Sequence, residues 1–273
     1  MNPVSLPPET AIGTVHLRVA DLEGMARWYE EVLGFEILAD DGATAALGAR
    51  GGRPLLVLHG HSGAPPRPRS VVGLFHVAFR LPDRRALGGM MRRVMAADWP
   101  FDGYADHNVS EAAYLRDPED NGLELYADRS TDVWRMVDGQ VFITTEPLDV
   151  PGVLLAAPRA VAALPEETVV GHIHLSVASL AASEAFYHGR LGFGVVSRRI
   201  PGALFMAAGD YHHHVGCNVW GEPARPSGSD GRRGLISYEV IVPAESARRA
   251  LLDGADEGLL VDPDQNGVRI VRR

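Results

Sequence analysis

The chain reads IGTVHLRVADLEGMARWYEEVLGFEIL from Ile12 to Leu38, and it reads VGHIHLSVASLAASEAFYHGRLGFGVV from Val170 to Val196. The two segments align without a gap. Each begins with the alternating pattern of a strand, continues with apolar residues at helical spacing, and ends at Leu-Gly-Phe, which opens another strand. Gly34 and Gly192 stand where a helix C-terminal cap is expected. The chain therefore contains an internal repeat.

A second pair of segments repeats in the same way. Gly73–Pro82 (GLFHVAFRLP) matches Gly234–Pro243 (GLISYEVIVP), and DPEDNG at 117–122 matches DPDQNG at 262–267. These matches predict an α+β fold of four βαβββ modules. The modules are expected at residues 9–61, 70–128, 167–220 and 231–273. Two domains, residues 9–128 and 167–273, would then be joined by a linker at residues 129–166.

The composition argues against several classes of function. The formal net charge is −9 and no basic run exceeds a few residues, which argues against a nucleic-acid partner or an anionic membrane surface. No apolar run approaches the ~20 residues of a membrane span, and the N-terminal residues lack the features of a signal peptide. The single cysteine, Cys217, excludes an intramolecular disulfide. These features predict a cytoplasmic protein.

Strand alternation divides the histidines of the second and third modules between two faces. Successive strand side chains point to opposite faces, and one face of each sheet is expected to be covered by its helix. His76, His172 and His174 then lie on the other, concave face. In YHHHVGCNVW the same rule places His212, His214 and Asn218 on the concave face and His213 toward the helix. The remaining positions expected to face the helices are Phe75, Val77, Phe79, Ile173, Leu175, Val177, Val215, Cys217 and Val219.

A carboxylate and a phenol come from the hairpin predicted at Asp106–Asp128 (DHNVSEAAYLRDPEDNGLELYAD). Its turn is strongly indicated, because proline presets φ and Asn-Gly supplies a positive φ. Tyr114 projects from the strand before the turn and Glu124 from the strand after it. Taken alone, this stretch is equally consistent with a half-exposed hairpin that carries a solvated Glu.

The concave candidates His76, Glu124, His172 and His214 offer imidazole nitrogen and carboxylate oxygen. These donors suit Fe(II), Mn(II), Zn(II) or Ni(II). Two His and one carboxylate on one face of a metal leave open positions for a bidentate substrate and O₂. The sequence therefore predicts a metal site on the concave face.

The repeat indicates where that site forms. The candidate ligands all lie in the second and third modules, and the matching positions of the first and fourth modules carry other residue types. A cup formed by residues 70–128 with 167–220 would gather the ligands, and the other two modules would form a metal-free cup. The matched pairs are His172 with Thr14, His76 with Ser237, and Glu124 with Arg269.

The modules, the Leu-Gly-Phe after each first helix, GHIHLSV and DHNVSEAAYLRDPEDNGLELY resemble the vicinal-oxygen-chelate superfamily. That superfamily includes glyoxalases, extradiol ring-cleaving dioxygenases and bleomycin-binding proteins. The resemblance implies two domains of the glyoxalase/dioxygenase type. Within the superfamily, the chain is most similar to the catechol-2,3-dioxygenase-like ring-cleavage proteins.

This resemblance implies roles for individual residues. The metal ligands would be His76, His172 and Glu124. Tyr114 stands ten residues before Glu124, as in extradiol enzymes, and would hydrogen-bond the bound catecholate. His213 matches the acid/base His of the family by local pattern, but His214 has the expected concave position and is preferred; it could also be a fourth ligand.

The activity implied is meta cleavage of a small aromatic diol by O₂ at Fe(II), or alternatively Mn(II), in a homodimer. One alternative is a glyoxalase-type isomerase or lyase, which would use Zn(II) or Ni(II). Another alternative is a non-catalytic protein that binds a drug-like small molecule.

Overall fold

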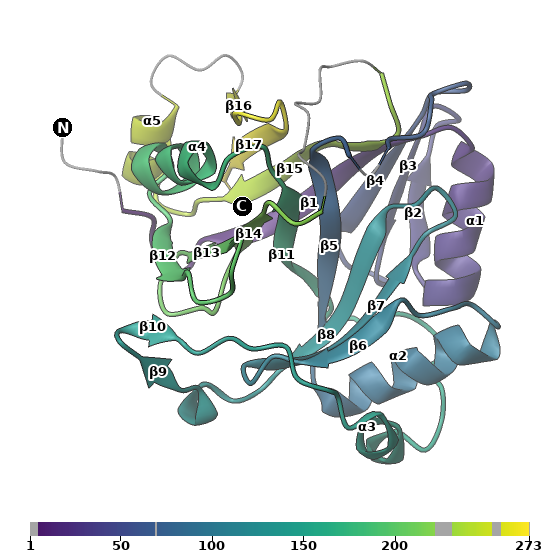
Figure 1. Cartoon of the computed structure of the whole chain (residues 1–273). Coiled ribbons are helices and arrows are strands. Elements are labelled where there is room, and N and C mark those ends of the chain that lie inside the picture. Colours follow the sequence, from purple (N-terminus) through teal and green to yellow (C-terminus); the bar gives the residue numbers. More distant parts are fainter. Residues whose placement is uncertain (1–4, 69, 222–230, 253–257, 273) are drawn as a thin grey trace.

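The computed structural model describes residues 5–68, 70–221, 231–252 and 258–272. It confirms the expected α+β class, with two mixed β-sheets and helices against their outer faces (Figure 1). The eight-stranded sheet comes from residues 73–128 and 169–218. In chain order its strands are β5 (Gly73–Leu81), β6 (Gly103–Asp106), β7 (Ser110–Arg116), β8 (Gly122–Asp128), β11 (Val169–Ser176), β12 (Gly194–Ser197), β13 (Ala203–Ala207) and β14 (Val215–Asn218). Their order in space is β12-β13-β14-β11-β5-β8-β7-β6.

The seven-stranded sheet comes from the first and last parts of the chain. Its strands are β1 (Ala11–Val19), β2 (Glu36–Asp40), β3 (Thr44–Gly48), β4 (Pro54–Gly60), β15 (Gly234–Ile241), β16 (Leu259–Val261) and β17 (Gly267–Val271). Their order in space is β16-β17-β15-β1-β4-β3-β2. In the described part of the fourth module, two strands follow the helix, where the repeat predicts three.

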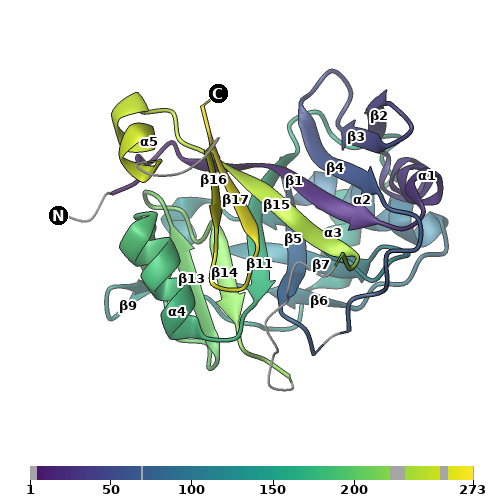
Figure 2. The same cartoon turned by 90° about the horizontal axis from the view of Figure 1, so that it is seen from above.

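Each sheet joins one module from each half of the chain. β5 pairs antiparallel with β11, and β1 pairs antiparallel with β15. Figure 2 shows β1 and β15 side by side across the molecule. The two halves of the sequence therefore share both sheets.

The principal helices are amphipathic and bury one face against these sheets. Repeat-related helices end alike: the predicted cap Gly34 has a φ of 72° and Gly192 a φ of 85°. Across the described residues, no helix is long and apolar enough to span a membrane. The helices are α1 (Leu22–Leu33), α2 (Arg84–Ala96), α3 (Val150–Ala156), α4 (Leu180–Glu184), which continues as the π-helix η2 (Ala185–Arg190), and α5 (Glu245–Leu251).

The segment expected as a linker packs on the second module. Its 3₁₀ turn η1 (Thr131–Val133) precedes a small hairpin of β9 (Met136–Val137) and β10 (Gln140–Val141). Its helix α3 contacts α2. Between them, Ile143 and Thr145 reach the cavity described below.

The two Asp-Pro turns connect neighbouring modules. The buried Asp117 carboxylate accepts hydrogen bonds from two backbone N–H groups of its own turn and from the Tyr29 hydroxyl in α1, at 2.9 Å. Asp262 accepts the same set, with the Tyr187 hydroxyl of η2 at 2.7 Å. Each turn thus fixes its module against the helix of the preceding module.

The role of Asn-Gly in the first turn differs from the sequence prediction. The left-handed residue is Asp120, with a φ of 68°, so the expectation that Asn-Gly supplies the positive φ is wrong. Gly122 is needed for close approach instead, because a Cβ there would lie 2.0 Å from the Phe75 carbonyl oxygen. Glycine at this position lets β8 pair closely with β5.

A β-bulge lies next to His76 in β5. The register pairs His174 with His76 and Leu175 with Leu74, which leaves Phe75 as the extra residue. A bulge interrupts the alternation of side chains. The expectation that Phe75 faces the helix is therefore wrong, and its ring lines the cavity on the other face.

Candidate metal centre

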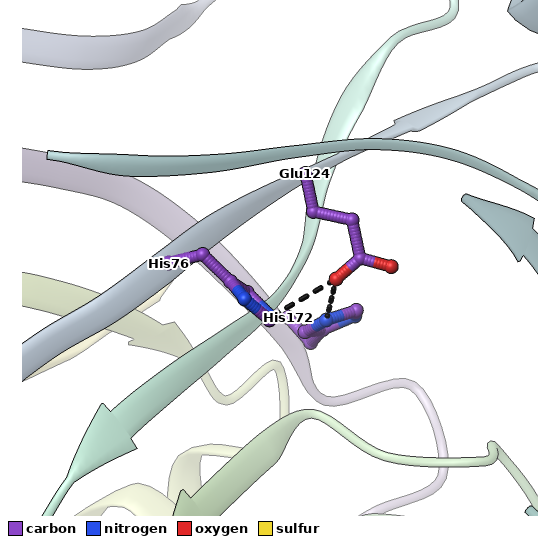
Figure 3. Close-up of side chains that lie close together, drawn as sticks. All are labelled: His76, Glu124 and His172. Atoms are coloured by element: carbon purple, nitrogen blue, oxygen red, sulfur yellow. Dashed lines mark hydrogen bonds and ion pairs between the residues drawn. The ribbon is translucent and has the colours of Figure 1, made fainter. Parts of the chain in front are cut away.

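Three side chains from three adjacent strands converge on one point of the eight-stranded sheet. His76 comes from β5, Glu124 from β8 and His172 from β11, and β5 lies between the other two strands (Figure 3). Nε2 of His76 is 2.9 Å, and Nε2 of His172 is 3.0 Å, from the same carboxylate oxygen, Oε2 of Glu124. The potential ligand atoms all lie within 4.8 Å of one another, and all three side chains are buried. The structure thus brings together the three residues predicted as ligands.

The hydrogen bonds of this cluster are incomplete. His76 Nε2 lies close to the carboxylate but lacks the geometry of a hydrogen bond, and His172 Nδ1 is buried without a partner among the described residues. Buried polar atoms are nearly always paired. Two imidazoles and a carboxylate that converge without satisfying one another are what a metal-binding site would present without its ion.

The protonation states also fit a metal. Burial opposes ionisation of Glu124, but the imidazoles of His172 and His76 outweigh it and hold the pKa of the carboxyl well below its usual range. Burial lowers the pKa of His172 to about 4, although Glu124 partly opposes this. A carboxylate and neutral imidazoles are the forms that coordinate divalent metals. The donor set suits Fe, Mn, Zn or Ni.

A cavity of about 330 Å³ opens beside the three residues. This volume is at the lower end of the range for small-molecule sites. Its walls are mainly apolar, and Tyr114 and His213 supply polar atoms close to the metal-ligand candidates. The lining residues include Phe75, His107, Val109, Ile143, His174, Ile200, Phe205 and Trp220.

The structure places His213, and not His214, in this cavity. The His213 ring lies 4.0 Å from the His172 ring, measured between centroids. His214 lines a separate cavity, and its Nδ1 accepts a hydrogen bond from the Ala208 N–H at 3.2 Å. The expected concave position of His214 is therefore wrong. Residues 211–214 precede β14 and are not in a strand, so the two-residue alternation does not apply to them.

Tyr114 takes part in a hydrogen-bonded chain that the sequence did not reveal. His107 Nδ1 lies 2.5 Å from the Thr144 carbonyl oxygen and must donate to it. With Nδ1 as the N–H of a neutral ring, Nε2 accepts from the Tyr114 hydroxyl, at 2.6 Å. Burial, together with the Glu124 charge, raises the pKa of Tyr114 well above its usual value and keeps the phenol protonated. Because the Tyr114 O–H donates its hydrogen bond to His107, the lone pairs of the Tyr114 oxygen are free to accept a hydrogen bond.

The corresponding face of the seven-stranded sheet lacks this chemistry. Among the described residues, the only group of three potential ligands with converging atoms is His76, Glu124 and His172. His16 does form a 3.0 Å contact with His59. Its counterpart His174 contacts Asn218 at 3.0 Å, so the two pairs are matching features of the repeated sheets.

Comparison with known proteins finds one matching family model and two dioxygenases with similar sequences. A family model described as Glyoxalase/Bleomycin resistance protein/Dioxygenase superfamily matches residues 11–125. Catechol-2,3-dioxygenase of Bacillus subtilis (strain 168) is 37% identical over 271 residues, which are 97% of this chain and 95% of that protein. Biphenyl-2,3-diol 1,2-dioxygenase 3 of Rhodococcus globerulus is 30% identical over 117 residues, 41% of this chain and 60% of that protein.

Solved structures show the same fold at low sequence identity. A putative dioxygenase from Bacillus subtilis superposes with a TM-score of 0.63 at 13% identity, covering 96% of this chain and 84% of that chain. Glyoxalase I from Zea mays superposes with a TM-score of 0.58 at 16% identity, covering 97% of this chain and 92% of that chain. These structures establish the fold alone.

Proposed function

The chain belongs to the Glyoxalase/Bleomycin resistance protein/Dioxygenase superfamily, and on that premise we propose that it is a metal-dependent extradiol dioxygenase that cleaves a catechol-type diol with O₂. The observation that carries this proposal is the convergence of His76, Glu124 and His172 beside a mainly apolar cavity. Similarity over nearly the whole chain to a catechol-2,3-dioxygenase supports the choice of substrate class.

His76, Glu124 and His172 would hold the metal, which we propose to be Fe(II) or alternatively Mn(II). When bound, such a metal supplies positions for both diol oxygens and for O₂. The ring of the diol would lie between the apolar walls. Phe75 and Phe205 give these walls aromatic faces and exclude water from the ring.

Two residues would act on the diol hydroxyls. His213 is neutral, because burial and then the surrounding histidines hold its pKa well below the usual value, so it can take a proton from one hydroxyl. The Tyr114 hydroxyl donates a hydrogen bond to His107, and its oxygen can therefore accept a hydrogen bond from the other diol hydroxyl. His213 would later return this proton to an oxygen of the forming ring-cleavage product.

The test is to load the purified protein with Fe(II) without air, add catechol and then air, and follow the yellow ring-cleavage product. We expect near-stoichiometric metal and yellow product in the wild type, and neither in Glu124→Ala. The matched control is Arg269→Ala, which changes the corresponding position of the other sheet and should retain both. Wild-type protein that binds iron but cleaves no catechol would overturn the proposal.

The alternatives predict other outcomes when the metal content of the purified protein is measured before Fe(II) is added. Bound Zn or Ni with no coloured product would favour a glyoxalase-type isomerase or lyase. Failure to bind any metal would favour a small-molecule binding protein. The homodimer and the cytoplasmic location expected from the sequence remain predictions.

A further inference from the structure

A hydrogen-bonded chain of three side chains runs from the cavity into the protein behind His213. His213 Nδ1 lies 2.7 Å from His212 Nδ1, and His212 Nε2 lies 2.9 Å from Asp128 Oδ1. His212 has no solvent exposure. Asp128 ends β8, four residues after Glu124, and its side chain is 22% exposed. This series of hydrogen bonds therefore begins at the partly exposed Asp128 and ends at His213 in the cavity.

The carboxylate at one end determines the direction of every hydrogen bond. An ionised carboxylate only accepts, so His212 must donate from Nε2. In neutral His212 the other nitrogen, Nδ1, then carries a lone pair and accepts. His213 must consequently donate from Nδ1, which leaves the lone pair of its Nε2 on the opposite side of the ring. Among the described residues this Nε2 has no hydrogen-bond partner, and His213 lines the cavity.

We propose that Asp128 and His212 are positioning residues that fix the tautomer of His213, so that an unprotonated Nε2 faces the substrate cavity. This assignment deepens the proposed function, because it provides the basic nitrogen that takes the diol proton. His213 is the catalytic residue, since it alone of the three lines the cavity. Fixing a tautomer through a hydrogen-bonded carboxylate is an established way to prepare an imidazole as a base.

Neighbouring side chains hold Asp128 and His212 in this orientation. The Asp128 oxygen that does not contact His212 is Oδ2, and it accepts from the Tyr211 hydroxyl at 3.1 Å and from Arg80 at 3.4 Å. Rings pack on both sides of His212, with the Tyr211 ring at 4.2 Å and the Trp134 ring at 5.4 Å between centroids. Rotation of His212 is therefore sterically restricted.

The same contacts make Asp128→Asn a sharp test. Arg80 can only donate, so the new amide should keep its oxygen at the Oδ2 position, where it can also accept from the Tyr211 hydroxyl. Its NH₂ then points at His212 Nε2 and forces that nitrogen to accept. Both imidazoles must switch tautomer, and His213 would present an N–H to the cavity. The substitution preserves shape, so folding should be retained.

The measurement is long-range ¹H–¹⁵N correlation NMR of metal-free protein labelled with ¹⁵N-histidine. In the wild type we expect His212 as the Nε2–H form and His213 as the Nδ1–H form, with both reversed in Asp128→Asn. Tyr211→Phe removes a different hydrogen bond to Asp128 and is the matched control that should keep the wild-type tautomers. His213 in the Nε2–H form in the wild type, or unchanged tautomers in Asp128→Asn, would overturn the proposal.

Steady-state kinetics connect the tautomer with catalysis. Loss of the base should lower kcat of Asp128→Asn by about 100-fold or more, within the range for general acid–base catalysis. KM should change little, because no cavity contact is removed. The NMR result needs neither metal nor substrate, so it decides the tautomer even if the wild type cleaves no catechol. Unaltered kcat with reversed tautomers would refute the role of Asp128 and His212 in catalysis.

Discussion

At the scale of single residues, two adjacent histidines occupy different environments. His213 lines the cavity beside His172, whereas His214 lines a separate cavity and its Nδ1 accepts from the Ala208 N–H. We predict that His213→Gln lowers kcat about 10²- to 10⁴-fold, as expected for loss of a general base. His214→Gln should stay within a few-fold of wild type and lose about 1 kcal/mol of stability with its hydrogen bond.

Kinetics and urea denaturation of the two variants side by side test this assignment. Because the residues are neighbours in sequence, general disturbance of the segment would affect both variants alike. A larger loss of kcat in His214→Gln than in His213→Gln would show that the wrong imidazole has been assigned.

These residues also show how far strand alternation could predict the site. It placed His76 and His172 on one face because the pairing of residues 76–78 in β5 with residues 172–174 in β11 is unbroken, and the hairpin brought Glu124 beside them. It failed for His213, which lies outside a strand, and for Phe75, which lies in a bulge. Both failures arise where the backbone departs from regular extended geometry, and no sequence signal marks a bulge or the start of a strand with that accuracy.

At the scale of elements, the Asp-Pro turns depend on a tyrosine from a neighbouring module. The Tyr29 hydroxyl donates to buried Asp117, and burial raises the pKa of that carboxyl to about 6 against its hydrogen bonds. We predict that Tyr29→Phe destabilises the protein by about 1–3 kcal/mol, because a buried acceptor loses a donor. Tyr187→Phe should have a similar effect through Asp262, with which it forms the matching bond.

The check is the urea midpoint of each single variant and of the double variant. The two bonds lie in different module pairs, so their effects should add. Destabilisation of less than about 0.3 kcal/mol in both single variants would mean that these hydrogen bonds do not hold the modules together.

The repeat allowed the main elements to be predicted from the sequence. Hydrophobic periodicity and glycine caps identify α1 and the helix of the third module, and both are found. The π-helical continuation of α4 and the contacts of residues 129–166 could not be predicted. They depend on tertiary packing, which local patterns do not encode. The role of His107 could not be predicted for the same reason, because its partner Thr144 lies in that segment.

At the scale of the whole molecule, several buried histidines make the metal-free protein sensitive to acid. Burial is the largest cause that lowers the pKa of His172 to about 4 and of His214 to about 3, from an ordinary value of 6.5. Between pH 6.5 and about 4 the unfolded chain therefore binds protons that the native protein does not. Stability rises with pH in this window and falls as pH drops through it.

As the pH falls from 6.5 to about 4, each such histidine removes on the order of 3 kcal/mol of stability, from about 1.4 kcal/mol per pKa unit. Asp117 and Asp264 act in the opposite direction in acid, because burial raises the pKa of both carboxyls, but six histidines have a lowered pKa. We predict that the urea midpoint of the metal-free protein falls markedly from pH 7 to pH 4.5. A midpoint that stays constant or rises would show that these imidazoles are charged in the native state.

The shared sheets lead to a prediction about the two halves of the chain. β5 pairs with β11 and β1 with β15, so neither half completes a sheet alone. We expect a chain cleaved between Arg159 and Ala160, which are both exposed, to elute from gel filtration as one particle with its metal. After separation in denaturant, neither fragment alone should bind the metal, because 1–159 carries His76 and Glu124 but 160–273 carries His172. Mixing the refolded fragments should restore binding. Spontaneous separation of the cleaved chain, or full metal affinity in one fragment, would contradict a site assembled across the two halves.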